Sequence, residues 1–149
     1  MNRVWTFIIG RDLNEQELQQ LQHMGEQFVK TWTAHEQALV AEFSIVNKRI
    51  VVVKVNESVH EASGCSIDKL SYFIKQAEKQ FNTDMLNRLL VALKTPEGLT
   101  VVHSSKIKDL LSAGKIQADT MVYNTAAANE NELAHWEQPL QNTWLKKYL

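Results

Sequence analysis

Cysteine is almost absent from this chain, because Cys65 is the only one among its 149 residues. A single thiol cannot close an internal disulfide, which excludes a disulfide-stapled scaffold and favours a reducing compartment. Glycine and proline are also scarce, with 5 and 2 residues respectively. Such low counts exclude collagen-like and proline-rich disordered chains. The composition therefore predicts an ordinary globular protein.

Excess charge of either sign is missing as well. The chain has 16 basic and 17 acidic side chains, so its net charge is −1. Without a positive field there is nothing to gather nucleic acid, and we expect no nucleic-acid partner. No hydrophobic run reaches the length of a membrane span, and the segment 1–7 is unlike a signal peptide. We expect a cytoplasmic protein that does not associate with membranes.

Apolar residues make up 44% of the chain, and their spacing indicates where the regular elements lie. A chain of this length is most simply one domain, here residues 1–149, and can bury a real core. We predict strands over 4–9, 39–46, 50–55, 88–93, 99–102 and 121–123. We predict helices after Asn14, over 66–81, and from residue 104 or 105.

The first six elements follow the order β-α-β-β-α-β, which is the ferredoxin-like arrangement of an α+β fold. Two helices would then cover one face of an antiparallel sheet. The later elements add a hairpin strand over 99–102 and a short helix. The tail is rich in Trp and Leu, which predicts a C-terminal extension that docks on the body.

The hexapeptide Ser63-Gly64-Cys65-Ser66-Ile67-Asp68 stands where a loop leads into the second long helix. A thiol near the positive end of a helix dipole is favoured in its reactive thiolate form. Cys65 is therefore a candidate nucleophile, with His35 and His60 as candidate bases. The competing interpretation is structural, because a free cysteine often only fills space in a core.

The neighbours of Cys65 also have two interpretations. We expect Gly64 to supply a positive φ or a close backbone approach at the turn. Ser63 and Ser66 are alternative N-caps for the helix. If the turn is exposed, its free N–H groups could instead bind a small anion.

One pocket could be formed by six residues, namely Trp32, His35, Glu57, His60, Cys65 and Asp68. The predicted binding residues are Trp32, Glu57, Ser63, Gly64, Ser66, Asp68 and Arg88. Arg88 would pair with Glu57 or Asp68 beneath this site, or with water at the end of a strand. The spacing from His60 to Cys65 is a weak zinc signal, so we predict no metal and no cofactor.

Two segments give the chain a family resemblance, namely Trp32-x-Ala34-His35 and the hexapeptide. With the tail Trp136-x-x-Pro139-Leu140-x-x-x-Trp144, they resemble a family of small bacterial proteins of uncharacterised function, often labelled "ABC transporter ATPase". The resemblance covers most of the chain. Two positions depart from the family pattern. Glu36 stands where that pattern has Gly, and Asn56-Glu57 stands where it has Asp-Glu.

The ATPase label fails a chemical test on this sequence. A phosphate-binding P-loop has the form G-x-x-x-x-G-K-[ST]. The only Gly-Lys pair is Gly114-Lys115, which is followed by Ile116, and Asp109 occupies the place of the first glycine. The sequence therefore excludes ATP hydrolysis by a P-loop mechanism.

Three classes of function follow. The favoured one is a non-catalytic cytosolic domain that binds a small molecule or a protein near the Gly64-Cys65-Ser66 turn. The second is a thiol-dependent enzyme or redox-sensitive protein with Cys65 as nucleophile and His35 or His60 as base. The third is a subunit whose sheet or aromatic tail forms a homodimer, which is compatible with the first.

Overall fold

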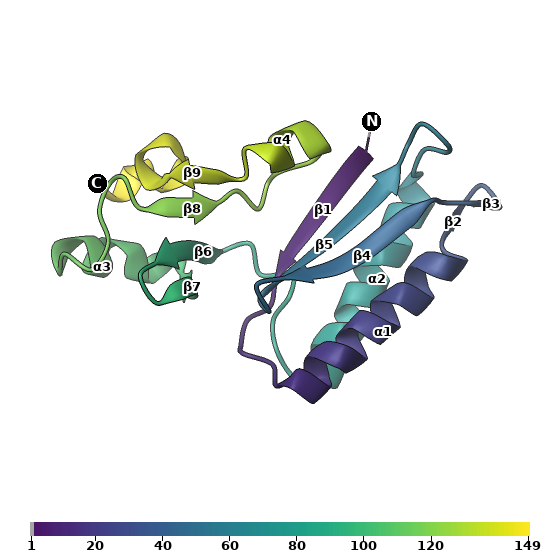
Figure 1. The fold of residues 1–149 in the computed structure, drawn as a ribbon, viewed down its shortest axis with the longest axis horizontal. Coiled ribbons are helices and arrows are strands. Elements are labelled where there is room, and N and C mark those ends of the chain that lie inside the picture. Colours follow the sequence, from purple (N-terminus) through teal and green to yellow (C-terminus); the bar gives the residue numbers. More distant parts are fainter. Residues whose placement is uncertain (1) are drawn as a thin grey trace.

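The computed structural model describes residues 2–149 and has a mixed α+β fold (Figure 1). Its strands are β1 (Asn2–Ile8), β2 (Thr33–Ala34), β3 (Gln37–Ala38), β4 (Ala41–Val46), β5 (Ile50–Asn56), β6 (Leu90–Thr95), β7 (Gly98–His103), β8 (Met121–Tyr123) and β9 (Glu137–Pro139). Its α-helices are α1 (Glu15–Thr31), α2 (Gly64–Phe81), α3 (Ile107–Ser112) and α4 (Glu130–Ala134), and 3-10 helices span Ser104–Lys106, Leu140–Asn142 and Trp144–Tyr148. Within residues 2–149, no helix is both long and apolar enough to cross a bilayer.

The first sheet has three antiparallel strands in the order β1-β5-β4, and α1 and α2 cover one of its faces (Figure 1). The central strand β5 is apolar over most of its length, as expected of a strand covered on both sides. Four consecutive residues, Ile50–Val53, are buried. Between the sheet and the two helices lies the largest core cluster, which contains Leu21, Phe43, Leu70, Ile74 and Phe81 among others.

The helix α1 begins after Asn14, as predicted, and a capping box stabilises its start. The Asn14 side chain accepts a hydrogen bond from the Glu17 N–H at 2.8 Å, and the Glu17 carboxylate accepts one from the Asn14 N–H at 3.1 Å. Gly25, a residue of low helix propensity, faces the ring of Phe43 on β4. A Cβ at position 25 would overlap that ring, so the glycine allows the helix and the sheet to approach closely.

The second sheet has four antiparallel strands in the order β7-β6-β8-β9. One face packs on α3 and on the C-terminal 3-10 helices, where Ile107, Leu140 and Leu145 are fully buried. The added hairpin strand, the short helix and the docked C-terminal extension are therefore confirmed. The docking is incomplete at Trp144 and Leu149, which are exposed.

The strand that a ferredoxin-like sheet would place beside β1 lies elsewhere. Three strands of that arrangement are present, but β6 pairs with β7 and β8 in the second sheet. The edge of β1 is met instead by the loop before α4, where the Val4 N–H donates to the carbonyl of Ala128 at 2.9 Å. The local hairpin with β7 gives β6 a partner only a two-residue turn away.

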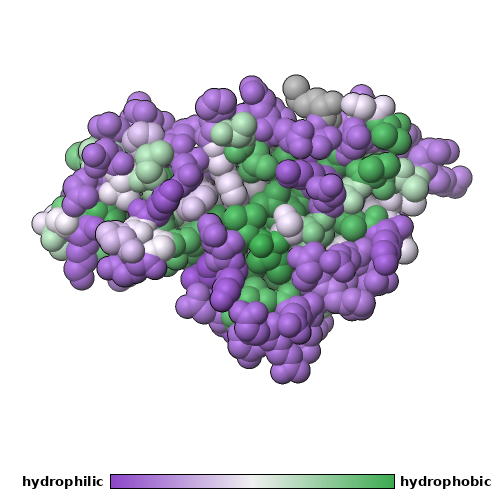
Figure 2. Space-filling model, in the orientation of Figure 1, coloured by the Kyte–Doolittle hydropathy of each residue, from purple (hydrophilic) through white to green (hydrophobic). Residues whose placement is uncertain are grey.

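The two sheets meet through the face of the first sheet that the helices leave uncovered. Val4, Ile8 and Val52 on that face form a buried cluster with Ala92 of β6. Figure 2 shows apolar surface in the middle of this face of the molecule, between the two sheets. The chain is thus layered as helices, first sheet, second sheet, and then α3 with the C-terminal segment.

Candidate functional site

The hexapeptide forms the start of α2, two residues earlier than predicted. Ser63 is the N-cap, and its hydroxyl accepts from the Ser66 N–H at 3.1 Å. The Ser66 hydroxyl accepts from the Ser63 N–H and donates to the Ser63 carbonyl, both at 2.7 Å. Ser66 is therefore the buried third residue of the helix, not a competing N-cap, and its hydroxyl both accepts and donates within the capping box.

Gly64 and Cys65 occupy the first two positions of the helix and are both exposed. The expected role of Gly64 is wrong, because its φ is not positive and a Cβ there would meet no atom within 4 Å. In the part of the chain that the structure describes, the N–H groups of these two residues have no acceptor. First-turn N–H groups lie at the positive end of the helix dipole.

Trp32 is a structural residue of this site. It is 1% exposed and packs among the core aromatics, in contact with Trp5 and Phe28. Its indole N–H donates to the carbonyl of Ser66 at 2.8 Å, which ties the end of α1 to the first turn of α2. A buried indole whose only donor is satisfied cannot recognise a ligand through that group.

The loop before α2 is held by two side-chain contacts to backbone. The Glu57 carboxylate accepts from the Ala62 N–H at 3.0 Å. The His60 Nε2 lies 3.0 Å from the carbonyl of Ala34, on the β2–β3 hairpin. Because a carbonyl oxygen only accepts, His60 Nε2 carries the proton in this contact, which leaves Nδ1 as the ring acceptor in the neutral imidazole.

The β2–β3 hairpin turns at His35 and Glu36, which have φ values of 51° and 66°. Such left-handed conformations favour glycine, so both residues hold a strained backbone. The turn projects the exposed His35 toward the loop before α2, so that it lines the same cavity as Glu57 and His60.

These segments enclose a cavity of about 390 Å³ beside the helix start. We name it the α2 pocket; its lining residues are His35, Glu57, Val59, His60, Glu61, Ala62 and Ser63. Four predicted site residues therefore meet, namely His35, Glu57, His60 and Ser63. The sequence did not single out Val59 or Ala62, although their position beside His60 in a short loop is a usable signal.

The other predicted residues lie apart from this pocket. Asp68 and Trp32 line a second cavity, of about 500 Å³, between α1 and α2. Arg88 pairs with neither Glu57 nor Asp68, because its Nη1 donates to the carbonyl of Thr6 at 2.7 Å on β1. Six of the predicted residues, Trp32, His35, Glu57, His60, Cys65 and Asp68, therefore do not share one pocket.

A thiol–imidazole pair is not formed. Across residues 2–149, no hydrogen bond joins the Cys65 thiol to His35, to His60 or to any other side chain. His60 Nε2 is already engaged with Ala34, so the ring is held by the hairpin and not by the thiol. The arrangement lacks the nucleophile–base contact that marks an activated cysteine.

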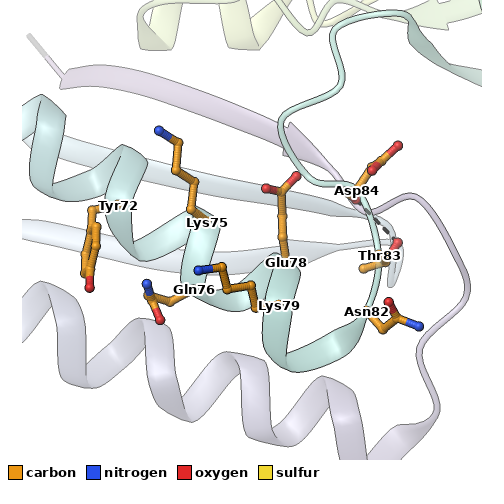
Figure 3. Close-up of a pocket in the computed structure, with 8 residues that line it drawn as sticks. All are labelled: Tyr72, Lys75, Gln76, Glu78, Lys79, Asn82, Thr83 and Asp84. Atoms are coloured by element: carbon orange, nitrogen blue, oxygen red, sulfur yellow. Dashed lines mark hydrogen bonds between the residues drawn. The ribbon is translucent and has the colours of Figure 1, made fainter.

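A further cavity, of about 620 Å³, runs along the C-terminal half of α2 (Figure 3). The Glu78 carboxylate in its lining has a structural role, because it accepts hydrogen bonds from the N–H groups of Met85 and Leu86 at 2.8 and 3.1 Å. Lys75 and Lys79 extend from the helix without an ion-pair partner among the described residues (Figure 3). The α2 pocket is better defined, because its side chains are held from two separate segments.

Metal binding finds no support in the described part of the chain. No group of three or more His, Cys, Asp or Glu side chains there could hold a metal ion. Comparison of the chain with known protein families, curated proteins and solved structures finds no match.

Proposed function

We propose that this chain is a non-catalytic domain that binds a small polar ligand in the α2 pocket. The observation that carries the proposal is the cavity of about 390 Å³ at the start of α2, whose size is that of a small-molecule site. A protein partner at the same surface is the broader form of the proposal, and a homodimer is compatible with it.

Pre-organisation supports ligand binding. Glu57 and His60 are fixed by hydrogen bonds to Ala62 and Ala34, so little side-chain entropy is lost when a ligand enters. Beside the pocket, the N–H groups of Gly64 and Cys65 offer two donors at the positive end of α2. A ligand that carries a hydrogen-bond acceptor suits such a pair of donors.

A panel of polar metabolites screened by thermal shift tests this function. We expect at least one compound to raise the melting temperature in a concentration-dependent way. The variant Ala62→Leu adds bulk to the pocket wall and is expected to abolish that shift. Ala113→Leu makes the same change at an exposed position beyond α3 and should leave the shift intact. If both variants respond like the wild type, the α2 pocket is not the binding site.

A thiol-dependent enzyme is the second candidate, and the exposure of Cys65 is the observation that favours it. Alkylation of this only cysteine by iodoacetamide separates the two functions. For a binding domain we expect native Cys65 to react no faster than in the urea-unfolded chain, because no base contacts it. A native rate well above the unfolded rate would favour the enzyme.

The family resemblance and a cytoplasmic location are also proposals. The positive φ of Glu36 supports the resemblance, because the family pattern has glycine at that position. The single cysteine supports a reducing compartment.

A further inference from the structure

Another cavity with its own chemistry lies at the edge of β1 that the loop before α4 meets, and it shares no lining residue with the α2 pocket. Its volume is about 420 Å³. We name it the β1-edge pocket; its lining residues are Arg3, Val4, Trp5, Thr6, Arg88, Thr125, Ala126, Ala127, Ala128 and Trp144. Four separate stretches of chain contribute, so the cavity is a product of the tertiary fold.

The charge of this cavity is entirely positive. Among the residues that the structure describes, the ionisable ones that line it are Arg3 and Arg88. A third cation lies beside it, because Lys147 Nζ is 5.2 Å from the ring centre of Trp144. None of these three side chains takes part in an ion pair within residues 2–149. In a chain of net charge −1, three unpaired cations around one cavity are a local excess.

Arg88 is held in place by contacts that do not neutralise it. One guanidinium nitrogen donates to the carbonyl of Thr6 at 2.7 Å, and its central carbon lies 5.2 Å from the ring centre of Phe7. The protein atoms packed around the group lower the pKa of Arg88 from its ordinary value, by removing water from the charged form. A guanidinium has five donors, so most of them are left for a ligand.

The carboxylates nearest along the chain are engaged elsewhere. On α4, Glu130 pairs with Lys54 at 3.8 Å and accepts from the Asn2 side chain at 2.8 Å. Glu132 accepts from the Ala128 N–H at 3.0 Å, as part of the cap of its own helix. Among residues 2–149, no carboxylate side chain lines the β1-edge pocket.

We propose that the β1-edge pocket binds a small organic anion. Its carboxylate or phosphate group would sit between Arg88 and Arg3, and its apolar part would rest against Trp144. Guanidinium groups match both oxyanions in planar, charge-assisted hydrogen bonds. The exposed indole of Trp144, at 48% exposure, gives an apolar ligand surface something to cover. This site is independent of the α2 pocket.

Titration by ¹H–¹⁵N NMR tests the site. The probes are phenyl phosphate, benzoate and inorganic phosphate, each added to the full chain. We expect phenyl phosphate or benzoate to shift the indole N–H signals of Trp5 and Trp144 saturably, and to bind more tightly than inorganic phosphate. The tighter of the two organic probes identifies the preferred anionic group. The amides of Gly64 and Gly114 should not move.

Substitutions that each remove one positive charge identify the side chains that bind the anion. Arg88→Gln should weaken binding about ten-fold or more, since one charge-assisted pair is lost. Arg3→Gln should weaken it too and leaves the Thr6 contact in place, so it covers the case that Arg88→Gln fails to fold. Lys108→Gln removes the same charge from α3 and should change nothing.

Absence of saturable Trp5 and Trp144 shifts with all three probes would overturn the proposal. Unchanged affinity in folded Arg3→Gln and Arg88→Gln would overturn it equally. Shifts at Gly64 in place of the two indoles would place the anion in the α2 pocket, which would contradict this inference and support the proposed function.

Discussion

Cys65 and Ser66 are neighbours at the start of α2, but the first is exposed and the second is buried. Successive helical residues point about 100° apart, so one side chain faces the core while the other faces water. Ser66 is 0% exposed and its hydroxyl both donates and accepts a hydrogen bond, whereas Cys65 is exposed and its thiol makes none among the described residues. The most constrained residue of the hexapeptide is thus Ser66.

Ser66→Ala is therefore expected to destabilise the fold. The change removes one half of the capping box and leaves the half-buried N–H of Ser63 without its acceptor, which costs about 1–3 kcal/mol. Urea unfolding measures the effect. Ser112→Ala, at the exposed end of α3, is the matched control and should change the free energy of unfolding by less than about 0.5 kcal/mol. Equal effects of the two substitutions would refute the structural role of Ser66.

Two glycines in helices predict opposite outcomes for the same substitution. Gly25→Ala gains helix propensity but drives a methyl group into the Phe43 ring, so we expect a net loss of about 1–3 kcal/mol. Gly64→Ala meets no atom and should be neutral or stabilising by up to about 1 kcal/mol. Thermal unfolding of the two variants compares them. A stable Gly25→Ala protein would contradict the close contact of α1 and β4.

At the scale of elements, the start of α1 is stabilised by charge. The hydrogen bond from Arg11, followed by that from the Asn14 N–H, lowers the pKa of Glu17 below its ordinary value of 4.5. A lowered folded-state pKa contributes stability above the unfolded-state pKa, and that contribution is lost as the pH falls through the folded-state value.

Glu17→Gln keeps the capping hydrogen bonds within reach but removes the charge. We expect it to be less stable than the wild type at pH 7, and the difference to shrink as the pH falls below about 4.5. Urea unfolding at several pH values measures the profile. Glu97→Gln removes the same charge from an exposed turn and serves as the control. A difference that persists unchanged at pH 3 would contradict the ion pair's role.

The β4–β5 turn carries backbone strain at known positions. Asn47 and Lys48 have φ values of 51° and 63°, the geometry of a type I′ turn, in which the second residue is preferably glycine. Lys48→Gly should raise the free energy of unfolding by about 0.5–1 kcal/mol, because a left-handed non-glycine residue is strained. Lys48→Ala loses the same exposed ion pair to Glu15 without relieving the strain, and should show no gain.

At the scale of the whole molecule, periodicity predicted the elements but not all their partners. The six strands expected from the sequence are present, and the predicted strands 39–46 and 50–55 form a hairpin that turns at Asn47-Lys48. The placement of β6 could not be predicted, because Leu90–Leu93 is apolar on both faces and suits either sheet. The short β2–β3 hairpin was missed because each strand has two residues and its turn contains no glycine.

The candidate site likewise has residues whose proximity the sequence predicts and residues whose position depends on the tertiary fold. His60 and Ser63 lie within one short loop, so the sequence alone brought them near each other. Arg88 lies 20 residues or more from the other predicted residues. It precedes β6, so its contact with Thr6 depends on how the second sheet sits beside β1. The β1-edge pocket was missed entirely, because Trp144 reaches it only through the docking of the C-terminal segment.

The shared cluster of Val4, Ile8, Val52 and Ala92 predicts that the two sheets unfold together. Native-state hydrogen exchange should give the amides of β5 and β6 the same opening free energy. Val52→Ala should lower both values equally, by about 1–3 kcal/mol, whereas the exposed Val40→Ala should lower neither. A fall confined to β5 would mean that the sheets are independent units.

Chemical-shift mapping of a ligand from the thermal-shift panel is the most direct test of the binding function. The account predicts that its addition shifts the backbone amides of Gly64 and Cys65 and the ring signals of His60, and leaves those of α3 unchanged. Shifts confined to residues outside the α2 pocket, or no bound compound in the panel at all, would contradict it.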